Sequence, residues 1–590
     1  MFRKTILVIV LFLIGFAIGN TAKAADVNGY TALYECRAKT VGEAGYANCN
    51  VDVATYTTAA CQQIIHTSDA WSTINWAADV ICIEAGDHTG KGTLTIPNSA
   101  NGTSGNYKVL RYYRSGDTDD DPWDQSDGNK AKLLRLHIDS ANYWIIHRLS
   151  FPETTTYIPE HVWVDNTTGG TPTNIILNRL HAVGGGTHDL YYGVSETKGN
   201  NITLQNSVIS GFYGIGPIDE AVGVAFEQGS NNHIVNNEIF DYAAHPLQVG
   251  NNNGPTMGGL VIENNDVYQS TTMQTNGGAN IGGEDTISIK AGAAVDNPMQ
   301  IIHNRVWGAR VTDLDVCCNG TNGAGIGINQ LPVLEVFPEG GYSSSGSYQY
   351  TLIKNNIISE SQWGISWYPS GAAQTSIIGN LFYSIKAYDS GTASYGIVLN
   401  SSETEIYLNS IIQSSATSIH FDSEPTNDVR CNTLISSGTK SGTYGTNTQA
   451  DVNVFYDTTS FTTGSTNIDK TVNTRANSQA YSLNDIIRTT ATPPADGTAG
   501  DFLYMVTTAG TSAGSPPSYT TTLGGTTTDG TMVVKAIRGP YSFWRKLRTT
   551  AEQVYIPYAK AHNSAPEYNY CPNTTGNRTG IGINNQTGTW

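Results

Sequence analysis

The chain has 590 residues, 14% of them charged, and its formal net charge is -18. A length of this order predicts about three or four ordinary domains, unless an internal repeat extends a single one. The excess of acid argues against nucleic acid and anionic membranes as partners, because their phosphates would be repelled. It is compatible with Ca²⁺ as a cofactor, since this ion prefers carboxylate oxygens.

The first 24 residues have the pattern of a targeting segment. Arg3 and Lys4 precede a long apolar run, and the small residues Ala22 and Ala24 follow it. This order predicts a secretory signal peptide cleaved near Ala24, and not a retained membrane span. No other stretch is apolar enough to cross a bilayer. We therefore expect a mature chain that is secreted, periplasmic or held at the cell surface, with its oligomeric state left open.

Residues 25–80 are expected to cap the fold that follows, because a solenoid needs a polar end cover. A helical pattern covers residues 57–66 of this segment. In an exported protein, four cysteines in this region predict two disulfides of undetermined pairing. The cysteines are Cys36, Cys49, Cys61 and Cys82. A metal site is the alternative, but the spacing lacks the Cys-x-x-Cys pattern of zinc ligands.

Ten asparagines recur through the middle of the chain, each two residues before an aliphatic or aromatic residue. They are Asn178, Asn206, Asn237, Asn265, Asn304, Asn356, Asn380, Asn409, Asn432 and Asn453. A short repeated core with variable gaps predicts a solenoid over residues 81–465, with one strand around the asparagine and a second after a glycine in each coil. Because an amide both donates and accepts, we expect each asparagine to bond those above and below it.

The repeat fades after about residue 465. Residues 501–537 alternate strand and turn patterns rich in Thr, Gly and Pro. They predict a small β module over residues 466–540, similar to modules appended to secreted or phage-type surface proteins. Residues 541–590 give no interpretable pattern. The strand patterns of the solenoid and of the small module together predict an all-β chain.

The repeated asparagine phrases resemble the coils of the pectin-lyase-like superfamily over roughly residues 75–460. The resemblance implies a right-handed parallel β-helix solenoid with a polysaccharide bound in a groove along it. The superfamily contains lyases, polygalacturonases, epimerases and phage tailspikes, so the fold leaves the reaction open.

The segment from Gly283 to Gly292 resembles two catalytic patterns of that superfamily. Glu284 and Asp285 are similar to the acid pair of polygalacturonases, but the following coils lack that family's Gly-His-Gly and Arg-Ile-Lys phrases. Asp285 and Lys290 match the spacing in chondroitin and alginate lyases, in which a carboxylate accompanies Ca²⁺ and the lysine removes a proton. The second upstream carboxylate of those lyases would fall on Gly283.

Alternation predicts an outward row on the second strands. If Ile287 and Ile289 face the interior, Ser288 and Lys290 face outward. The same register in neighbouring coils places Glu227 two rungs from Lys290, about 9–10 Å away. We expect a sugar-binding trough along these rows, with an aromatic ring to stack on a sugar. The expected substrate-binding residues are Glu227, Gln248, Ser288, Asn329, Tyr368 and His245.

Lys290 is expected to act as a general base, which requires a pKa lowered by burial or by nearby cations. The alternative is a solvated lysine paired with Glu284 or Glu227. His245 is the weakest member of the expected site, since a lone histidine is more often structural. The expected catalytic residues are Lys290, Asp285, Glu284 and Arg305.

A second row is expected on the first strands, directly after the ladder asparagines: Arg179, Ser207, Glu238, Asp266 and Arg305. Glu238 and Asp266 would be like charges on adjacent rungs, which is costly unless a cation or an arginine lies between them. They resemble the stacked acids that bind Ca²⁺ in pectate lyases, where an arginine one or more coils away takes the proton. The resemblance implies a Ca²⁺ site at Glu238 and Asp266, with Arg305 as the proton acceptor. The alternative is a salt-bridged column of these three side chains.

These residue types together predict a secreted lyase that cleaves a uronate-containing polysaccharide by β-elimination, which needs a base and positive charge beside the substrate carboxylate. A polygalacturonase-like glycoside hydrolase using a carboxylate pair is one alternative. A non-catalytic polysaccharide-binding adhesin is another, because a β-helix needs no active site to fold.

Overall fold

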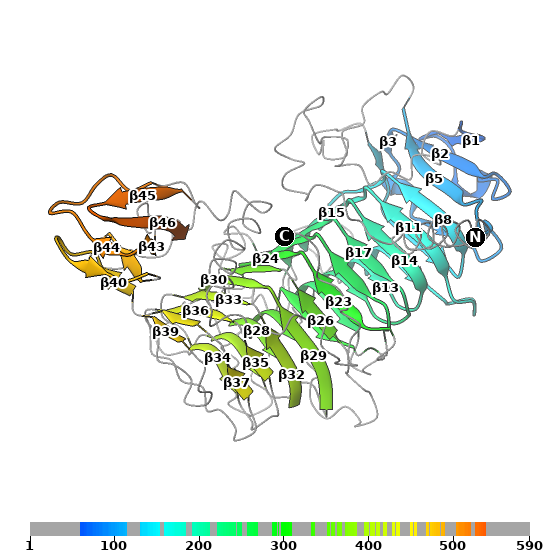
Figure 1. Ribbon diagram of the computed structural model, residues 1–590. Helices are drawn as coiled ribbons and strands as arrows, with labels where there is room; N and C mark the ends of the chain where they lie inside the picture. Colours follow the sequence, from blue (N-terminus) through cyan, green and yellow to red (C-terminus); the bar gives the residue numbers. More distant parts are fainter. Residues whose placement is uncertain are drawn as a thin grey trace, which may run out of the picture.

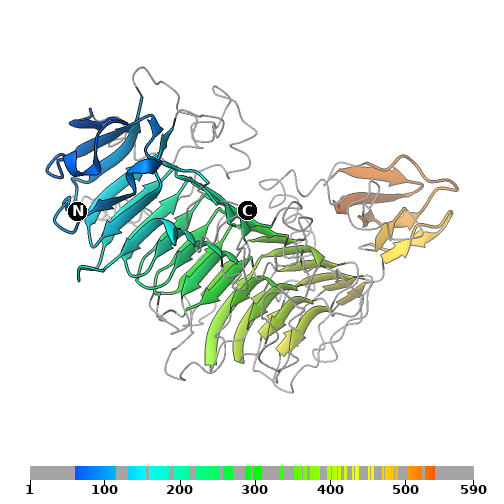
Figure 2. The same cartoon turned by 180° about the vertical axis from the view of Figure 1, so that it is seen from behind.

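The computed structural model is a long stack of parallel strands followed by a smaller β module (Figures 1 and 2). The structure describes residues 60–114, 130–153, 158–184, 192–212, 221–242, 245–250, 257–269, 286–291, 293, 297–308, 332–336, 351–354, 356–359, 361, 363–367, 372–385, 395–399, 402–407, 409–413, 417–421, 428–430, 432–436, 449–451, 454–456, 468–470, 472–483, 485–489, 503–520 and 525–538. The predicted signal peptide and residues 541–590 lie outside these ranges.

Three parallel sheets, here called sheets A, B and C, run along the stack, and each complete coil passes through them in that order. Sheet A contains β1 (Gln63–Ile65), β2 (Val80–Glu84), β5 (Lys108–Tyr113), β8 (Asn142–His147), β11 (Thr173–Asn178), β14 (Asn200–Gln205), β17 (His233–Val235), β20 (Val261–Glu263), β23 (Met299–Ile302), β26 (Thr351–Lys354), β29 (Ala372–Ile378), β32 (Ser402–Tyr407), β35 (Asp428–Arg430) and β37 (Gln449–Asp451).

Sheet B follows sheet A in each coil. It contains β3 (Gly86–Asp87), β6 (Ala131–Lys132), β9 (Ser150–Phe151), β12 (His181–Val183), β15 (Val208–Phe212), β18 (Glu238–Tyr242), β21 (Asp266–Tyr268), β24 (Arg305–Trp307), β27 (Ile357–Ser359), β30 (Leu381–Ile385), β33 (Ser410–Gln413), β36 (Thr433–Ser436), β38 (Val454–Tyr456) and β39 (Ile468–Lys470).

Sheet C completes each coil. It contains β4 (Thr93–Ile96), β7 (Arg135–Asp139), β10 (Glu160–Asp165), β13 (Tyr192–Glu196), β16 (Val222–Phe226), β19 (His245–Gly250), β22 (Ile287–Lys290), β25 (Pro332–Val336), β28 (Trp363–Trp367), β31 (Tyr395–Leu399) and β34 (Thr417–Phe421). The strands of all three sheets pair in parallel with the coils before and after. The predicted right-handed parallel β-helix is confirmed.

Each complete coil of the described residues contains three strands, so the expectation of two was wrong. From Asn206 to Asn432 the repeated asparagine lies outside the strands, whereas Asn178 is the last residue of β11. Asn265, for example, lies between β20 of sheet A and β21 of sheet B, where the chain turns a corner. A single sequence phrase therefore supplies the end of one strand, a corner and the start of the next.

The corner asparagines form the predicted hydrogen-bonded ladder. The Nδ2 of Asn265 donates to Oδ1 of Asn304 at 3.0 Å and to the carbonyl oxygen of Ile234 at 2.8 Å. The same pattern links Asn237, Asn265, Asn304, Asn356, Asn380, Asn409 and Asn432 in order. All seven are fully or almost fully buried, so each amide satisfies polar groups that water does not reach.

The ladder shifts by one residue in the early coils. Asn206 Nδ2 donates to Asn178 Oδ1, and Asn236 Nδ2 donates to Asn206 Oδ1. Asn237, the first member of the main ladder, instead accepts from the backbone N–H of Ser207. Asn178 and Asn206 therefore belong to a separate, offset set. Asn453 lies outside the described residues.

Inward side chains fill the β-helix with apolar residues, both aliphatic and aromatic. Ile287 and Ile289 of β22 are fully buried in this core, as are Val224 and Phe226 of β16. Burial of each such side chain contributes roughly 1.5–3 kcal/mol. The alternation used to separate inward from outward positions in sheet C is thereby confirmed.

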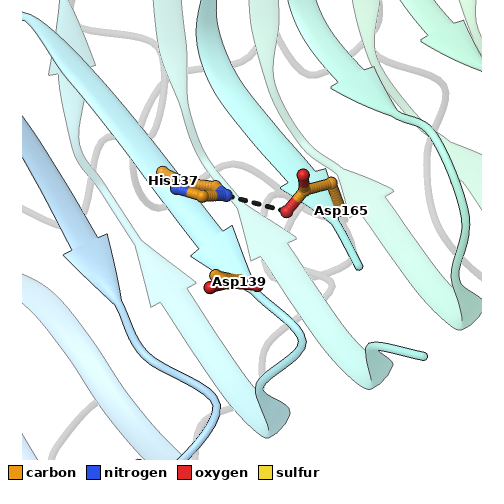
Figure 3. A group of neighbouring side chains, drawn as sticks. All are labelled: His137, Asp139 and Asp165. Atoms are coloured by element: carbon orange, nitrogen blue, oxygen red, sulfur yellow. Dashed lines mark hydrogen bonds and ion pairs between the residues drawn. The ribbon is translucent and has the colours of Figure 1, made fainter. Parts of the chain in front are cut away.

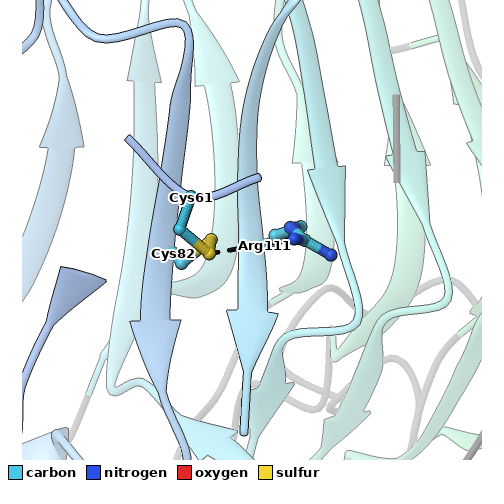
Figure 4. Close-up of a disulfide and its surroundings, with 3 residues drawn as sticks. All are labelled: Cys61, Cys82 and Arg111. Atoms are coloured by element: carbon cyan, nitrogen blue, oxygen red, sulfur yellow. Dashed lines mark hydrogen bonds between the residues drawn. A yellow bond between two sulfur atoms is a disulfide. The ribbon is translucent and has the colours of Figure 1, made fainter. Parts of the chain in front are cut away.

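The described chain begins inside the segment expected to be a cap. Residues 63–65, expected to be helical, form β1, which pairs in parallel with β2. A disulfide joins Cys61 to Cys82, and Arg111 on the next strand donates to Cys61 Sγ at 3.7 Å (Figure 4). Cys36 and Cys49 lie outside the described residues. Two short 3-10 helices, η2 (Trp71–Thr73) and η3 (Thr89–Lys91), connect the first strands.

A small C-terminal β module is present, as predicted. Its main sheet has the order β40 (Val472–Thr474), β42 (Ile486–Arg488), β43 (Leu503–Thr508), β46 (Met532–Arg538) and β45 (Thr526–Asp529), and a second pairs β41 (Ala480–Tyr481) with β44 (Gly510–Thr511). Arg475 donates to both carboxylate oxygens of the buried Asp529, at 2.8 and 3.0 Å. The described residues contain no helix long and apolar enough to span a membrane.

Candidate functional site

The outer face of sheet C carries most of the residues expected to bind substrate. In this sheet Ala225 pairs with Gln248, and Gln248 pairs with Ser288, which is the expected register. Gly250 pairs with Lys290, the last residue of β22. One further residue along the same register places Glu227 beside Gly250, so Glu227 and Lys290 are two rungs apart, about 9–10 Å.

The expected place of Asn329 is corrected by the next strand. Ser288 pairs with Glu335 of β25, so the rung after β22 is formed by residues 332–336 and not by the glycine-rich segment that ends at Asn329. Glu335 then pairs with Ser366 of β28. Asn329 and Tyr368 themselves lie outside the described residues, as do Glu284 and Asp285.

The row that contains Lys290 extends toward the N-terminus, where it includes further acidic residues. Asp139 and Asp165 pair on β7 and β10. The register of the following strands continues this row through Thr197 to Glu227. The residues of this sheet C row are Asp139, Asp165, Thr197, Glu227, Gly250 and Lys290. Five rung spacings make the row about 24 Å long.

The neighbouring outward column is mostly closed to solvent. Ser195, Ala225 and Ser288 are each no more than 1% exposed, although they point away from the aliphatic core. Gln248 is half-buried, and its Nε2 donates to the carbonyl oxygen of Gly250 at 3.2 Å. His245, at the start of β19, is only 3% exposed. A ligand reaches Gln248 more easily than the small residues on either side.

The N-terminal end of the row contains a group of potential metal ligands that sequence reasoning missed. Ligand atoms of His137, Asp139 and Asp165 all lie within 4.8 Å of one another. His137 Nε2 lies 2.7 Å from Asp165 Oδ1, and the imidazole points toward Asp165 across the two strands (Figure 3). His137 and Asp139 alternate outward along β7, and Asp165 ends β10. The sequence signal for this group was a pair of outward acids in adjacent strands. It could not be aligned, because both strands precede the first repeated asparagine.

An aromatic ring fixes the imidazole of this group. Trp163 stacks on His137 with ring centroids 4.3 Å apart. The Arg135 guanidinium lies over the Trp163 ring, 4.9 Å from its centroid, and also bonds Glu160. Burial raises the pKa of Glu160, while the charge of Arg135 opposes that shift. Arg135 is thus engaged by Trp163 and Glu160.

The second predicted row lies on sheet B, a different face of the β-helix. Glu238, Asp266 and Arg305 pair in succession as expected. The residue before Glu238 in this row is Val208, so the expected Ser207 and Arg179 do not belong to it. Arg305 lies on sheet B and Lys290 on sheet C, so the two do not share a catalytic surface.

The contacts on sheet B fit the salt-bridged alternative better than a Ca²⁺ site. Arg305 Nη2 donates to Asp266 Oδ2 at 2.7 Å, and the Tyr268 hydroxyl donates to Glu238 Oε1 at 2.8 Å. Glu238 and Asp266 are 3% and 2% exposed. The Arg305 guanidinium occupies the position of the positive charge that these acids need, and it also lies over the Trp307 ring at 4.3 Å.

No protein-family model matches this sequence, and no curated protein matches it either. Among solved structures, a mannuronic acid specific family 6 polysaccharide lyase from human gut microbiota is 16% identical, with a TM-score of 0.38 over 70% of this chain and 82% of its own. Pectate lyase Pel9A is 14% identical, with a TM-score of 0.38 over 63% of this chain and 80% of its own. The A-module of mannuronan C-5 epimerase AlgE6 from Azotobacter vinelandii is 12% identical, with a TM-score of 0.33 over 64% and 90%.

This chain has a parallel β-helix fold. Sheets A, B and C display that fold directly. The reaction has to be argued from the residues on the outer faces of those sheets.

Proposed function

We propose that this protein is an exported polysaccharide lyase that cleaves a uronate-containing chain by β-elimination along the outer face of sheet C. The observation that carries the proposal is the sheet C row, in which three acids and a lysine occupy four of six positions in one line across successive rungs. A straight row of about 24 Å suits a linear polymer better than a compact small molecule.

The chemistry requires a base near C5 of the uronate and positive charge beside its carboxylate. Neutral Lys290 would take the C5 proton, the electron pair would form the C4–C5 double bond, and the C4–O bond would break. The leaving oxygen would then take a proton from the protonated lysine. Glu284 and Asp285 are separated from β22 by Thr286 in the sequence and remain the carboxylates predicted for this site.

Arg305 has no step in this mechanism, because it lies on sheet B and bonds Asp266. Glu227 and Gln248 are the proposed substrate-binding residues, since both are partly exposed on the same sheet as Lys290. His245 and Ser288 are too buried to contact a sugar in this arrangement.

Binding without cleavage is the second candidate function. It is favoured by the burial of Ser195, Ala225 and Ser288, which closes the column beside the row. A hydrolase that uses Glu284 and Asp285 is a third outcome of the same experiment.

The test incubates the purified chain with pectate, alginate, chondroitin and neutral glucans, each with and without EDTA. Ultraviolet absorbance of an unsaturated uronate is expected from one of the acidic polymers. Lys290→Ala should remove that activity and leave the unfolding temperature unchanged. Lys198→Ala is the matched control, because Lys198 is exposed just beyond β13 but outside the row. New reducing ends without ultraviolet absorbance would indicate hydrolysis, and retention without products would indicate a binding protein. Full activity of Lys290→Ala would remove this lysine from the mechanism.

A further inference from the structure

The group formed by His137, Asp139 and Asp165 has the composition of a metal site. It brings one imidazole nitrogen and two carboxylates to within 4.8 Å of one another, from two adjacent strands of a rigid sheet. Asp139 and Asp165 are 8% and 3% exposed, and the His137 side chain is 14% exposed. A partly exposed donor beside two buried ones gives an ion a way in.

The two carboxylates are stabilised without a cationic side chain. Asp139 Oδ1 accepts from the Thr168 N–H at 3.1 Å, from the Thr168 hydroxyl at 2.9 Å and from the Ser140 hydroxyl at 3.2 Å. Asp165 is bonded by His137 and by the Thr167 hydroxyl. No lysine or arginine of the described residues bonds either acid. Like charges on adjacent rungs therefore remain without a fixed positive charge between them.

One ligand atom is available to an ion. Asp139 is more than nine-tenths buried, yet its Oδ2 accepts no hydrogen bond from the described residues. The nearest arginine of β7, Arg135, is already engaged by Glu160 and by the Trp163 ring. Asp139 Oδ2 is not one of the solvent-excluded atoms that lack a partner, so water can reach it, and a cation can replace that water beside the second carboxylate and the imidazole.

We propose that His137 Nε2, Asp139 Oδ2 and Asp165 Oδ1 bind one divalent transition-metal ion, with Zn²⁺ preferred over Mn²⁺ and both preferred over Ca²⁺. An imidazole with two carboxylates suits Zn²⁺ and accommodates Mn²⁺, whereas Ca²⁺ takes six to eight oxygens. In a tetrahedral site with metal–ligand bonds of about 2.1 Å, the donor atoms lie about 3.4 Å apart. His137 Nε2 and Asp165 Oδ1 must therefore separate from 2.7 Å, while the Asp139 carboxylate approaches them. Three protein ligands leave a fourth position to water.

This site is distinct from the proposed catalytic lysine. Asp165 and Lys290 are four rungs apart in sheet C, about 19 Å. The metal-site proposal does not depend on the proposed lyase activity, and each fails or stands by a different measurement.

The experiment titrates Zn²⁺, Mn²⁺ and Ca²⁺ separately into the full chain after EDTA treatment and dialysis, with calorimetry and the unfolding temperature as readouts. One equivalent of Zn²⁺ should bind and raise the unfolding temperature, because it binds the folded chain only. His137→Ala and Asp139→Asn should each weaken Zn²⁺ binding by at least about tenfold. Asp139→Asn keeps Oδ1 as an acceptor for Thr168, so it separates loss of the ligand from loss of the fold.

The matched controls are His66→Ala and Asp87→Asn. His66 is an exposed histidine that also faces a carboxylate, Glu84, at 3.1 Å, and Asp87 is an exposed aspartate bonded by Thr89. Both variants should bind Zn²⁺ like the original chain. The proposal is overturned if none of the three ions binds saturably, if Ca²⁺ binds most tightly, or if His137→Ala and Asp139→Asn retain the original affinity in a folded chain.

Discussion

Sheets B and C each place two acids on adjacent rungs and stabilise them in different ways. On sheet B, Glu238 and Asp266 are bonded by Tyr268 and Arg305. On sheet C, Asp139 and Asp165 are bonded by hydroxyls, a backbone N–H and an imidazole. The sheet B pair already has its positive charge, so it has little use for a metal. The sheet C pair has none, and its proposed cation is exchangeable.

A third arrangement occurs inside sheet C. Glu196 points into the core between the rungs of Val164 and Phe226 and is fully buried. Neither of its oxygens has a hydrogen-bond partner of good geometry. Burial raises the pKa of Glu196 well above its ordinary value, and the negative charge of Glu227 adds to the shift, although the backbone of Gln228 opposes it. Burial therefore favours the neutral form of this acid, whereas the acids on the outer faces are bonded by polar or cationic partners.

The largest effect should follow loss of the sheet B cation. Arg305→Leu would leave Asp266 buried without its ion-pair partner and beside Glu238, at a cost of about 3–5 kcal/mol in the free energy of unfolding. Denaturant unfolding measures this cost. The double variant Arg305→Leu/Asp266→Asn is the control and should recover much of the loss. If the single variant loses less than about 1 kcal/mol, the ion pair does not stabilise this row.

The next effect concerns the interior acid. Replacing the buried, poorly bonded carboxyl by an apolar side chain in Glu196→Leu should stabilise the chain by about 1–3 kcal/mol at neutral pH. Glu196→Gln removes the titrating proton and keeps a polar side chain of similar size. Because the folded-state pKa is raised, the folded chain keeps a proton that the unfolded chain releases above about pH 4.5. The contribution of Glu196 to stability is therefore full below that pH and is lost as the pH rises toward the raised pKa.

The measurement is the unfolding free energy as a function of pH. Glu196→Gln should flatten the decline above about pH 4.5 relative to the original chain. Glu160→Gln is a useful comparison, because Arg135 bonds Glu160 and opposes the effect of its burial. An unchanged slope in Glu196→Gln would mean that this carboxyl is ionised in the folded chain.

The sequence predicts the β-helix better than it predicts the site. The ladder from Asn237 to Asn432 could be predicted because the same side chain returns at the same corner. The pairing of Gln248 with Ser288 followed from alternation alone. The placement of Asn329 was wrong because two strand-like segments, the glycine-rich one that ends at Asn329 and residues 332–336, lie between Asn304 and Asn356. The second segment begins at Pro332. Because proline is tolerated as the first residue of a strand, it does not exclude this segment, and alternation alone could not choose between the two.

The metal group could not be found by the same route. His137, Asp139 and Asp165 precede Asn178, the first repeated asparagine, so no repeated residue fixed their register. The separation of Arg305 from Lys290 was also hidden, because a coil of three strands places residues only a short sequence distance apart on different faces.

A smaller effect is expected from the hydroxyl that bonds Glu238. Tyr268→Phe removes the 2.8 Å hydrogen bond to a carboxylate that is 3% exposed, and should cost about 1–2 kcal/mol. The Tyr268 ring stacks between Phe240 and Trp307 at 4.9 and 4.1 Å, and phenylalanine preserves this stack. Phe240→Leu tests the stack without the hydroxyl. Equal stability of Tyr268→Phe and the original chain would show that Glu238 does not need this donor.

The smallest expected change in stability distinguishes the acid pairs of sheets B and C most directly. Without metal, Asp139→Asn should change stability by no more than about 0.5 kcal/mol, because the amide oxygen still accepts from Thr168 while repulsion from Asp165 disappears. Asp266→Asn, the matching change on sheet B, should cost about 2 kcal/mol because it removes the charge that Arg305 requires. Addition of Zn²⁺ should then stabilise the original chain and the Asp266→Asn variant but not Asp139→Asn. Equal losses of unfolding free energy for the two substitutions in EDTA would contradict this comparison. They would mean that sheets B and C stabilise their acid pairs by the same kind of interaction.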